Sequence, residues 1–225
     1  MHIGLIGGIG TAATEFYYRG LTDRHARSGT RLDLTIANAE VRDLSQNLAN
    51  KNARKQAEIF AALISRLKAA GAQIAAVTSM GGHFCVGELL PISPLPILNG
   101  VPEVDTAVGR GKFKTIGIIG TRMVMETRLY GAISSAAVVV PRGAELDEVH
   151  DNYVAMATAG RVNDAQRRVF LAAGERLCRE QNAEVVLLGG TDLFLAFQDR
   201  DAGFPVLDCA DVHVDAIYQA SLRTT

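Results

Sequence analysis

Short apolar runs, separated by longer amphipathic stretches, recur along the whole chain. Two of them, Ile74–Val77 and Val185–Leu188, are continuous and partly β-branched, which is typical of strands buried on both faces of a parallel sheet. Each follows a stretch that reads as a helix ending at Gly71 or Asn182, residue types suited to the left-handed position after a helix. Each leads into a turn of small residues, TSMGGH in one case and GGTD in the other. Open α/β sheets bind ligands at such strand ends, so both turns are candidate site segments.

The rest of the pattern predicts further strands and helices in alternation. Strands are expected at 2–6, 32–37, 73–78, 96–98, 116–120, 184–189 and 205–208, and helices at 11–27, 52–70, from 101 onward, at 163–181 and at 212–222. Asn163 followed by Gln166 predicts a capping-box start for one of these helices. This alternation is typical of an α/β fold with parallel sheets.

The pattern restarts in the second half of the chain. Ile3–Gly7 matches Ile116–Gly120, strand 73–78 matches 184–189, and the segment 96–99 matches 205–208, all in the same order. An ordered set of matches indicates an internal duplication. We therefore predict two similar parallel-sheet α/β domains related by pseudo-twofold symmetry, with the site in the interdomain cleft. Residues 1–100 plus 209–225 form the first domain and 101–208 the second, 109–111 is the clearest linker signal, and the terminal helix packs back on the first domain.

Composition narrows the class of protein. The net charge of −1 provides no global field for nucleic acid or an anionic membrane. The three cysteines have no zinc-type spacing and are interpreted as reduced thiols of a cytoplasmic protein. The start MHIGLIGG reads as a first strand rather than a signal peptide, and no run of about 18 apolar residues indicates a membrane span.

The first turn of the chain has the spacing Gly8-x-Gly10-x-x-Ala13, and an acidic residue, Glu40, follows the next strand. This arrangement satisfies the dinucleotide-binding fingerprint, in which a helix N-terminus receives a pyrophosphate. A tight turn with close helix packing explains the same residues equally simply. Dinucleotide binding therefore remains an alternative.

The turn after strand 73–78 carries Ser79, Gly81 and His83. Backbone N–H groups in such a turn can bind an anion, and Ser79 can donate a hydrogen bond or, if deprotonated, act as a base. His83 can act as an acid or a base near neutral pH, or it can cap or pack on its own helix. Cys85 is expected to be a buried, inert thiol. A serine hydrolase is not indicated, because the chain has no Gly-x-Ser-x-Gly elbow.

The turn after strand 184–189 carries Thr191 and Asp192. Asp192 is a candidate general base or orienting group, and helix capping by either residue is the alternative. Arg42, expected in the loop after the second strand, can clamp a substrate carboxylate or remain a solvated surface residue. Asp208 is expected to hold the hinge or to cap the terminal helix.

These segments resemble the aspartate/glutamate racemase superfamily along nearly the full chain. GGIGTAATEFYYRGL looks like the opening stretch of that family, residues 78–83 stand where it has Pro-Cys-Asn-Thr-Ala-His, and LGGTDL stands where it has Gly-Cys-Thr-Glu. Pro205–Asp208 and His213 match its closing segment. The resemblance implies two α/β domains with pseudo-twofold symmetry, no cofactor, and a dimer. It also implies two cysteines, one per domain, that remove and return the proton at the substrate α-carbon.

The chain departs from the family pattern at the residues that carry this chemistry. The two cysteine positions are Ser79 and Gly190, and Met80 and Gly81 replace the asparagine and threonine that follow the first cysteine. Thr158 stands where a lysine is expected. A serine hydroxyl is a far weaker base than a thiol of pKa about 8.5, and glycine has no side chain, so a two-thiol mechanism is absent.

The sequence therefore predicts a cofactor-independent enzyme of this superfamily, in a cytoplasmic homodimer, that acts on a small carboxylate or amino-acid-like ligand. Isomerase, lyase and decarboxylase chemistry all remain open. The alternatives are a catalytically inactive carboxylate-binding or regulatory protein and a dinucleotide-binding protein. No metal, nucleic-acid or membrane partner is expected. The predicted catalytic residues are Ser79, Asp192 and His83, and the predicted substrate-binding residues are Gly8, Arg42, Met80, Gly81, Thr121, Gly190 and Thr191.

Overall fold

The computed structural model describes residues 1–198 and 201–223. The chain forms two compact units, Met1–Gly100 with His213–Thr225 and Val101–Val212. We call them unit 1 and unit 2 and describe each by itself. The second segment of unit 1 begins at His213, within the last helix.

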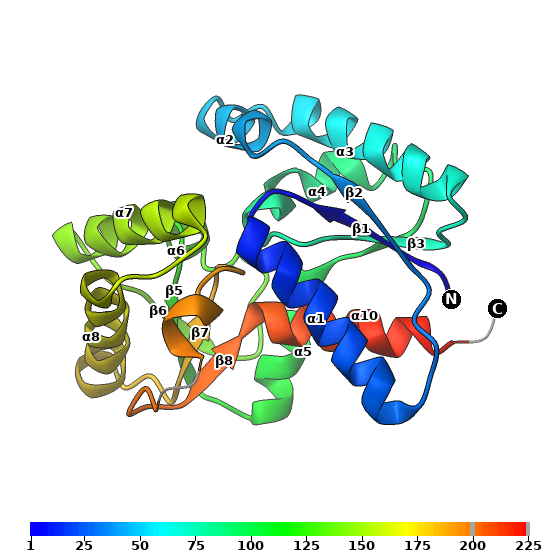
Figure 1. The fold of residues 1–225 in the computed structure, drawn as a ribbon. Helices are drawn as coiled ribbons and strands as arrows, with labels where there is room; N and C mark the ends of the chain where they lie inside the picture. Colours follow the sequence, from blue (N-terminus) through cyan, green and yellow to red (C-terminus); the bar gives the residue numbers. More distant parts are fainter. Residues whose placement is uncertain (199–200, 224–225) are drawn as a thin grey trace. The chain divides into compact units, whose positions relative to one another are not determined.

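Unit 1 is built on a four-stranded parallel sheet of order β2-β1-β3-β4 (Figure 1). The chain forms β1 (Ile3–Gly7), α1 (Thr11–Ser28), β2 (Leu34–Asn38), α2 (Val41–Ala49), α3 (Ala53–Ala69), β3 (Ile74–Val77), the 3₁₀ helix η1 (Gly81–Cys85), α4 (Val86–Leu89) and β4 (Ile97–Leu98). The central strand β1 sets the register, with Leu5 opposite Ile36 of β2 and Ala76 of β3.

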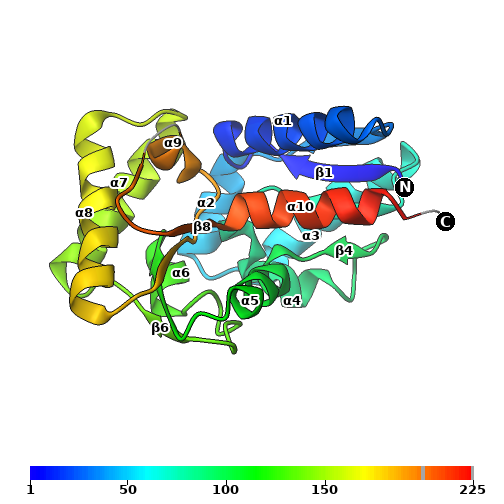
Figure 2. The ribbon, with the colours of Figure 1, turned by 90° about the horizontal axis from the view of Figure 1, so that it is seen from below.

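Helices cover both faces of this sheet. Helix α3 lies over one face, and α1 and the terminal helix α10 (Cys209–Ser221) lie over the other (Figures 1 and 2). Helix α3 buries the apolar stripe that its sequence predicts, formed by Ala57, Phe60, Ile64 and Leu67.

Unit 2 repeats the arrangement with a four-stranded parallel sheet of order β6-β5-β7-β8. Its elements are α5 (Gly100–Gly111), β5 (Thr115–Ile119), α6 (Arg122–Glu126), β6 (Ala137–Val139), α7 (Ala144–Ala159), α8 (Asp164–Gln181), β7 (Val185–Leu188), α9 (Phe194–Phe197) and β8 (Val206–Asp208). Helix α8 packs on β5, β7 and α7, around a core that includes Phe170.

The two sheets have equivalent strand orders, so the predicted α/β class and the internal repeat are confirmed at the level of topology. The predicted helix ends are also confirmed. Asn163 and Gln166 form a complete capping box at the start of α8. Asn182 caps the other end of α8 in the left-handed conformation with φ of 56°, and Gly71 after α3 has φ of 97°.

Two local expectations are wrong. Residues 109–111 are the last turn of α5 rather than a linker, because the helix starting at Gly100 continues to Gly111. Arg42 lies in the first turn of α2 rather than in a loop, because Glu40 accepts a hydrogen bond from the Arg42 N–H and starts a helix directly after β2.

The terminal helix packs on the rest of unit 1 through buried and partly buried polar contacts. The Tyr17 hydroxyl donates to Nδ1 of His213 at 2.9 Å, and Nε2 of His213 donates to the Leu98 carbonyl at 3.1 Å. His25 Nε2 lies 3.0 Å from the Ser221 hydroxyl, and the chain's amino terminus donates to the Ser221 carbonyl at 2.6 Å. Burial lowers the pKa of His213 to about 3, so this ring is neutral near pH 7.

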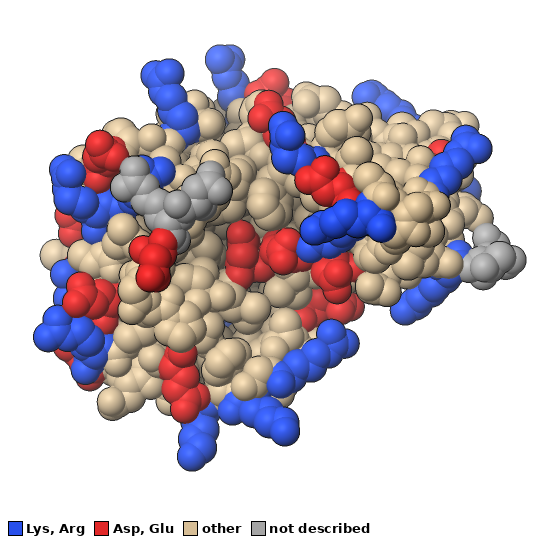
Figure 3. Space-filling model, turned by 60° about the horizontal axis from the view of Figure 1, so that its bottom comes forward, with Lys and Arg blue, Asp and Glu red and all other residues tan. Residues whose placement is uncertain are grey.

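The surface carries both signs of charge. On the face shown in Figure 3, lysine and arginine side chains lie interspersed with aspartate and glutamate. Among the described residues, no helix is long and apolar enough to cross a membrane.

Candidate functional site

The turn after β3, residues 78–83, holds the Ser79 hydroxyl in a defined environment. The Thr78 hydroxyl donates to the Ile6 carbonyl at 3.0 Å and so ties the end of β3 to the end of β1. Ser79 is 7% exposed, and its Oγ accepts a hydrogen bond from the Gly82 N–H at 3.3 Å. Within the described part of the chain this hydroxyl donates to no protein group, so its proton is available to a ligand.

His83 is held in one neutral tautomer. Its Nδ1 lies 2.7 Å from the Ser79 carbonyl, which can only accept, so Nδ1 carries the proton. Its Nε2 accepts from the Gly100 N–H at 3.2 Å. Burial lowers the pKa of His83 to about 4, which agrees with a neutral ring. Both ring nitrogens are therefore used in holding the β3 turn, which is the packing alternative rather than the acid–base role predicted for His83.

Met80 of this turn and Cys85, which follows it, are packed inward. Met80 is fully buried, and Cys85 is a buried thiol that donates to the Gly82 carbonyl at 3.4 Å. Burial raises the pKa of Cys85 to about 12, which confirms the inert thiol expected from the sequence. Gly81 is partly exposed, and a side chain there would come within 3.7 Å of the Ser79 Oγ.

The turn after β1 has a structural explanation. The Gly8 N–H donates to the Thr14 hydroxyl at 2.9 Å, and that hydroxyl donates to the Gly10 carbonyl at 2.9 Å. Gly8 has φ of 85°, and a Cβ there would lie 2.2 Å from the Asn38 side chain. Glu40, the acidic residue of the fingerprint, caps α2. These contacts favour the tight-turn interpretation over a pyrophosphate site.

The turn after β7, residues 189–192, brings a hydroxyl and a carboxylate together at a strand end. Thr191 is 1% exposed and Asp192 is 3% exposed. The Thr191 hydroxyl oxygen is buried without a hydrogen-bond partner among the described residues. Such a group costs free energy unless something binds it, so it is the strongest local sign of a ligand position. The N-cap of the following helix α9 is Leu193, so neither Thr191 nor Asp192 is its N-cap residue.

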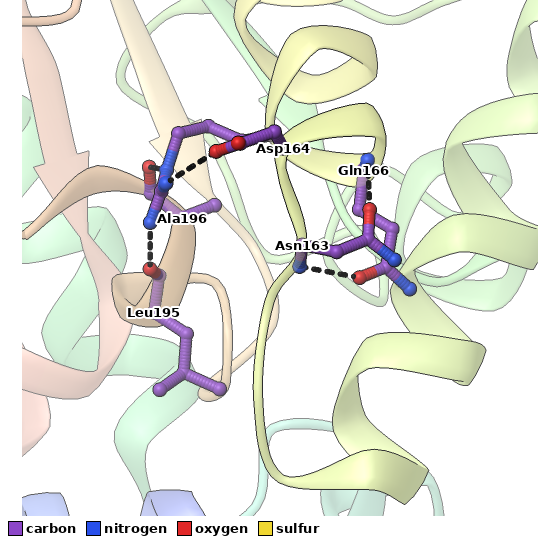
Figure 4. Close-up of polar contacts among 6 residues, drawn as sticks. Asn163, Asp164, Gln166, Leu195 and Ala196 are labelled. Carbon is purple, nitrogen blue, oxygen red and sulfur yellow. Dashed lines mark hydrogen bonds and ion pairs between the residues drawn. The ribbon is translucent and has the colours of Figure 1, made fainter.

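Arg167 of α8 fixes the short helix that follows this turn. Its guanidinium donates to the carbonyls of Ala196 at 3.1 Å and Leu195 at 3.2 Å, and it also contacts Asp164 at 3.5 Å. Figure 4 shows the Leu195 and Ala196 carbonyls facing this donor group, beside the capping box that starts α8. The chain leaving Asp192 is therefore anchored by a charged group, which satisfies carbonyls at the end of α9.

Two more predicted ligand-binding residues lie at the start of a helix, Thr121 in unit 2 and Arg42 in unit 1. Thr121, after β5, accepts from the Val124 N–H at 3.3 Å and caps α6. Arg42 is exposed in the first turn of α2. Thr158 is exposed in α7.

The end of β8 and the start of α10 carry two buried titratable groups, the Asp208 carboxyl and the Cys209 thiol. Asp208 accepts from the Ala210 N–H at 2.8 Å and caps α10, which is one of the two roles expected for it. Burial raises the pKa of Asp208 to about 7, so this carboxyl titrates near neutral pH. Burial and the charges of Asp208 and Asp192 raise the pKa of Cys209 well above its usual value, so it remains a thiol. In the described ranges, no group of three or more histidine, cysteine, aspartate or glutamate side chains could hold a metal ion.

Tyr153 of α7 is a residue of this region that the sequence analysis missed. It is buried, and its hydroxyl donates to Oδ2 of Asp192 at 3.4 Å. The signal that could have revealed its helix is the spacing of the buried residues Leu146, Val149, Tyr153 and Met156.

Comparison with known proteins finds a family model that matches most of the chain and solved structures with the same fold. The family model described as Asp/Glu/Hydantoin racemase matches residues 6–217. A proposed Asp/Glu racemase of Yersinia pestis shares 23% identity and a TM-score of 0.85, with 99% of this chain and 100% of that chain covered. An aspartate racemase homologue of Pyrococcus horikoshii OT3 shares 21% identity and a TM-score of 0.80, with 99% of each chain covered.

A more distant structure with a bound ligand has the same fold. It is a glutamate racemase of Francisella tularensis in complex with D-glutamate, with 14% identity, a TM-score of 0.69, and 100% of this chain and 84% of that chain covered. At these identities the structures establish the fold alone.

Proposed function

Because the chain belongs to the Asp/Glu/Hydantoin racemase family, we propose that it is an enzyme that moves a proton at a carbon next to a carbonyl group. Its substrate is a small carboxylate or amino-acid-derived compound, and no cofactor takes part. Asp192 is the base, and the Ser79 and Thr191 hydroxyls donate to the substrate. The observation that carries this proposal is the buried, unpartnered Thr191 hydroxyl beside the buried Asp192 carboxylate at the end of β7.

The choice of Asp192 over His83 follows from their hydrogen bonds. His83 needs both ring nitrogens to hold the Ser79 carbonyl and the Gly100 N–H, so it positions the β3 turn instead of transferring protons. Asp192 presents a carboxylate in a buried turn, where water competes poorly for the substrate proton. Ser79 contributes a hydrogen-bond donor rather than a base.

The base limits the substrate class. A carboxylate of ordinary pKa about 3.9 is a weaker base than a thiolate of about 8.5, so the driving force for removing a proton from an unactivated amino acid is small. A more acidic carbon suits this base better. In a malonate two carbonyl groups flank that carbon, and in a hydantoin ring it lies next to an uncharged amide carbonyl instead of a carboxylate. Loss of carbon dioxide from a malonate breaks the C–C bond and leaves an enolate at that carbon, and Asp192 would then have to be in its acid form to deliver a proton to it.

The remaining predicted residues complete the proposed binding set. Arg42 adds a positive charge from the first turn of α2, and Gly81 leaves the space beside the Ser79 Oγ without a side chain. Met80, Thr121 and Gly190 shape the site. We leave Gly8 out of this set, because its N–H is bound to Thr14.

The experiment is a ligand panel followed by proton NMR in D₂O and by carbon dioxide release. The panel contains succinate, malate, aspartate, a 5-substituted hydantoin and methylmalonate. Asp192→Asn should abolish turnover, while Asp151→Asn, an exposed residue of the same unit, serves as the matched control. Turnover that persists in Asp192→Asn would refute the role of Asp192.

Binding variants test the donors separately. Ser79→Ala and Thr191→Val should each weaken a bound carboxylate by about 1.5–3 kcal/mol, the usual value for a hydrogen bond to a charged group. Ser65→Ala, on the exposed surface of α3, is the control. The double variant tests whether both hydroxyls serve one ligand, because coupled donors give non-additive losses. Arg42→Ala should weaken binding and reduce its salt dependence.

A second candidate function is ligand binding without turnover. The observation that favours it is the absence of a thiol at positions 79 and 190. Calorimetric binding of a panel compound, with no exchange or carbon dioxide release under the same conditions, would establish this alternative in place of the enzyme.

A further inference from the structure

The side-chain space of residue 190 is filled by another residue. A Cβ built on Gly190 would lie 2.3 Å from Cε2, 2.5 Å from Cζ and 2.7 Å from the hydroxyl oxygen of Tyr153. Real Cβ contacts are essentially never shorter than 3.0 Å, so even alanine would require the tyrosine ring to move. The Tyr153 ring therefore occupies the volume that a side chain at position 190 would need.

The hydroxyl of the same ring contacts the Asp192 carboxylate. Tyr153 is 7% exposed and donates to Oδ2 of Asp192 at 3.4 Å. Burial raises the pKa of Tyr153 well above its usual value, and the charges of Asp192 and Cys209 raise it further, against a backbone hydrogen bond from Asp192. The phenol is therefore protonated at neutral pH, and its proton is available to the carboxylate.

We infer that Tyr153 positions Asp192 as the proton acceptor, and that Gly190 and Tyr153 form a matched pair that replaces a side chain at position 190. The inference rests on the proposed function of Asp192. Tyr153 is a positioning residue, because it acts through the carboxylate. The hydrogen bond from the Tyr153 hydroxyl fixes the orientation of the carboxylate group, as the second group of a base–orienter pair does.

The first test is independent of any substrate. Gly190→Ala should lower Tm by several degrees, because the new methyl group meets the ring. Tyr153→Phe retains the ring atoms Cε2 and Cζ, so Gly190→Ala should cost as much in that background. In Tyr153→Ala the ring is gone, and Gly190→Ala should then cost almost nothing. An equal loss of Tm in all three backgrounds would overturn the matched pair.

The second test concerns the hydroxyl alone. Tyr153→Phe should raise the pKa of the Asp192 carboxyl, measured by ¹³C NMR, by about one unit, because a donor to the charged form is lost. Tyr18→Phe, an exposed tyrosine, is the control and should leave it unchanged. With a turned-over panel compound, kcat should fall about tenfold with little change in KM, and the acidic limb of the pH profile should move upward.

The outcomes distinguish the positioning role of Tyr153 from the proposed catalytic role of Asp192. An Asp192 pKa that is the same in wild type and Tyr153→Phe overturns the positioning role, whatever the activity. A shifted Asp192 pKa, together with turnover that survives Asp192→Asn, shows that the hydroxyl contact exists but overturns the proposed function, and with it the catalytic meaning of the pair. A shifted pKa with loss of turnover in Asp192→Asn and a tenfold loss in Tyr153→Phe supports both.

Discussion

Replacing Thr191 by valine is expected to stabilise the protein, whereas most substitutions of buried residues destabilise it. Thr191 is 1% exposed, and its Oγ1 lies buried without a hydrogen-bond partner among the described residues. Valine has nearly the same shape and replaces this oxygen by a methyl group. Thr191→Val should therefore remove a cost rather than a contact, whereas most buried substitutions destabilise a protein.

The magnitude follows from the cost of an unsatisfied polar group. A buried hydroxyl without a partner costs about 1–3 kcal/mol, so the free energy of unfolding should rise by about that amount. In a chain of this size, each kcal/mol corresponds to a rise in Tm of about 2–4 °C. The same substitution should weaken a bound carboxylate, so stability and affinity should change in opposite directions.

The assay is urea unfolding of wild type and Thr191→Val, with calorimetric titration of a panel ligand. Thr106→Val is the control, since Thr106 is exposed and its hydroxyl already donates to the Pro102 carbonyl. A loss of about 1 kcal/mol or more in Thr191→Val would mean that the hydroxyl is satisfied in the free protein, for example by an ordered water, and would refute the reasoning.

Three further predictions concern the buried histidines, the missing thiols at positions 79 and 190, and the three cysteines. The pKa of His83 is lowered to about 4 and that of His213 to about 3, so below pH 6.5 the unfolded chain takes up protons before the folded chain does. The free energy of unfolding should therefore fall as the pH drops from 6.5 toward 4, by up to about 1.4 kcal/mol per pH unit for each histidine. The fall should be shallower in His83→Gln, and comparing this variant with wild type cancels the opposing effect of the raised pKa of Asp208, which both proteins share. Aspartate and glutamate should show no α-proton exchange by NMR in D₂O, because neither position 79 nor position 190 carries a thiol; exchange at a typical enzyme rate of about 1–10³ s⁻¹ would contradict this. A thiol reagent should modify Cys178 first, because Cys85 and Cys209 are buried with raised pKa values; simultaneous labelling of all three in the folded protein would contradict it.

Several features of the molecule could be read directly from the sequence, because they depend on neighbours along the chain. The strands β1, β3, β5 and β7 follow from continuous apolar runs, and the capping box at Asn163 from residues three positions apart. The equivalent sheets follow from the repeated order of motifs. Asp208 as the cap of α10 also needs only its own two following residues.

Only the tertiary structure decided what the candidate side chains do. His83 is confined to one tautomer by the N–H of Gly100, and Tyr153 reaches Gly190 and Asp192 from a different helix. Neither contact has a local pattern, because it depends on where a helix packs against a strand end. The sequence determined that position 190 lacks a thiol, and the packing of α7 decided that a tyrosine ring fills the place, because two side chains cannot occupy one volume.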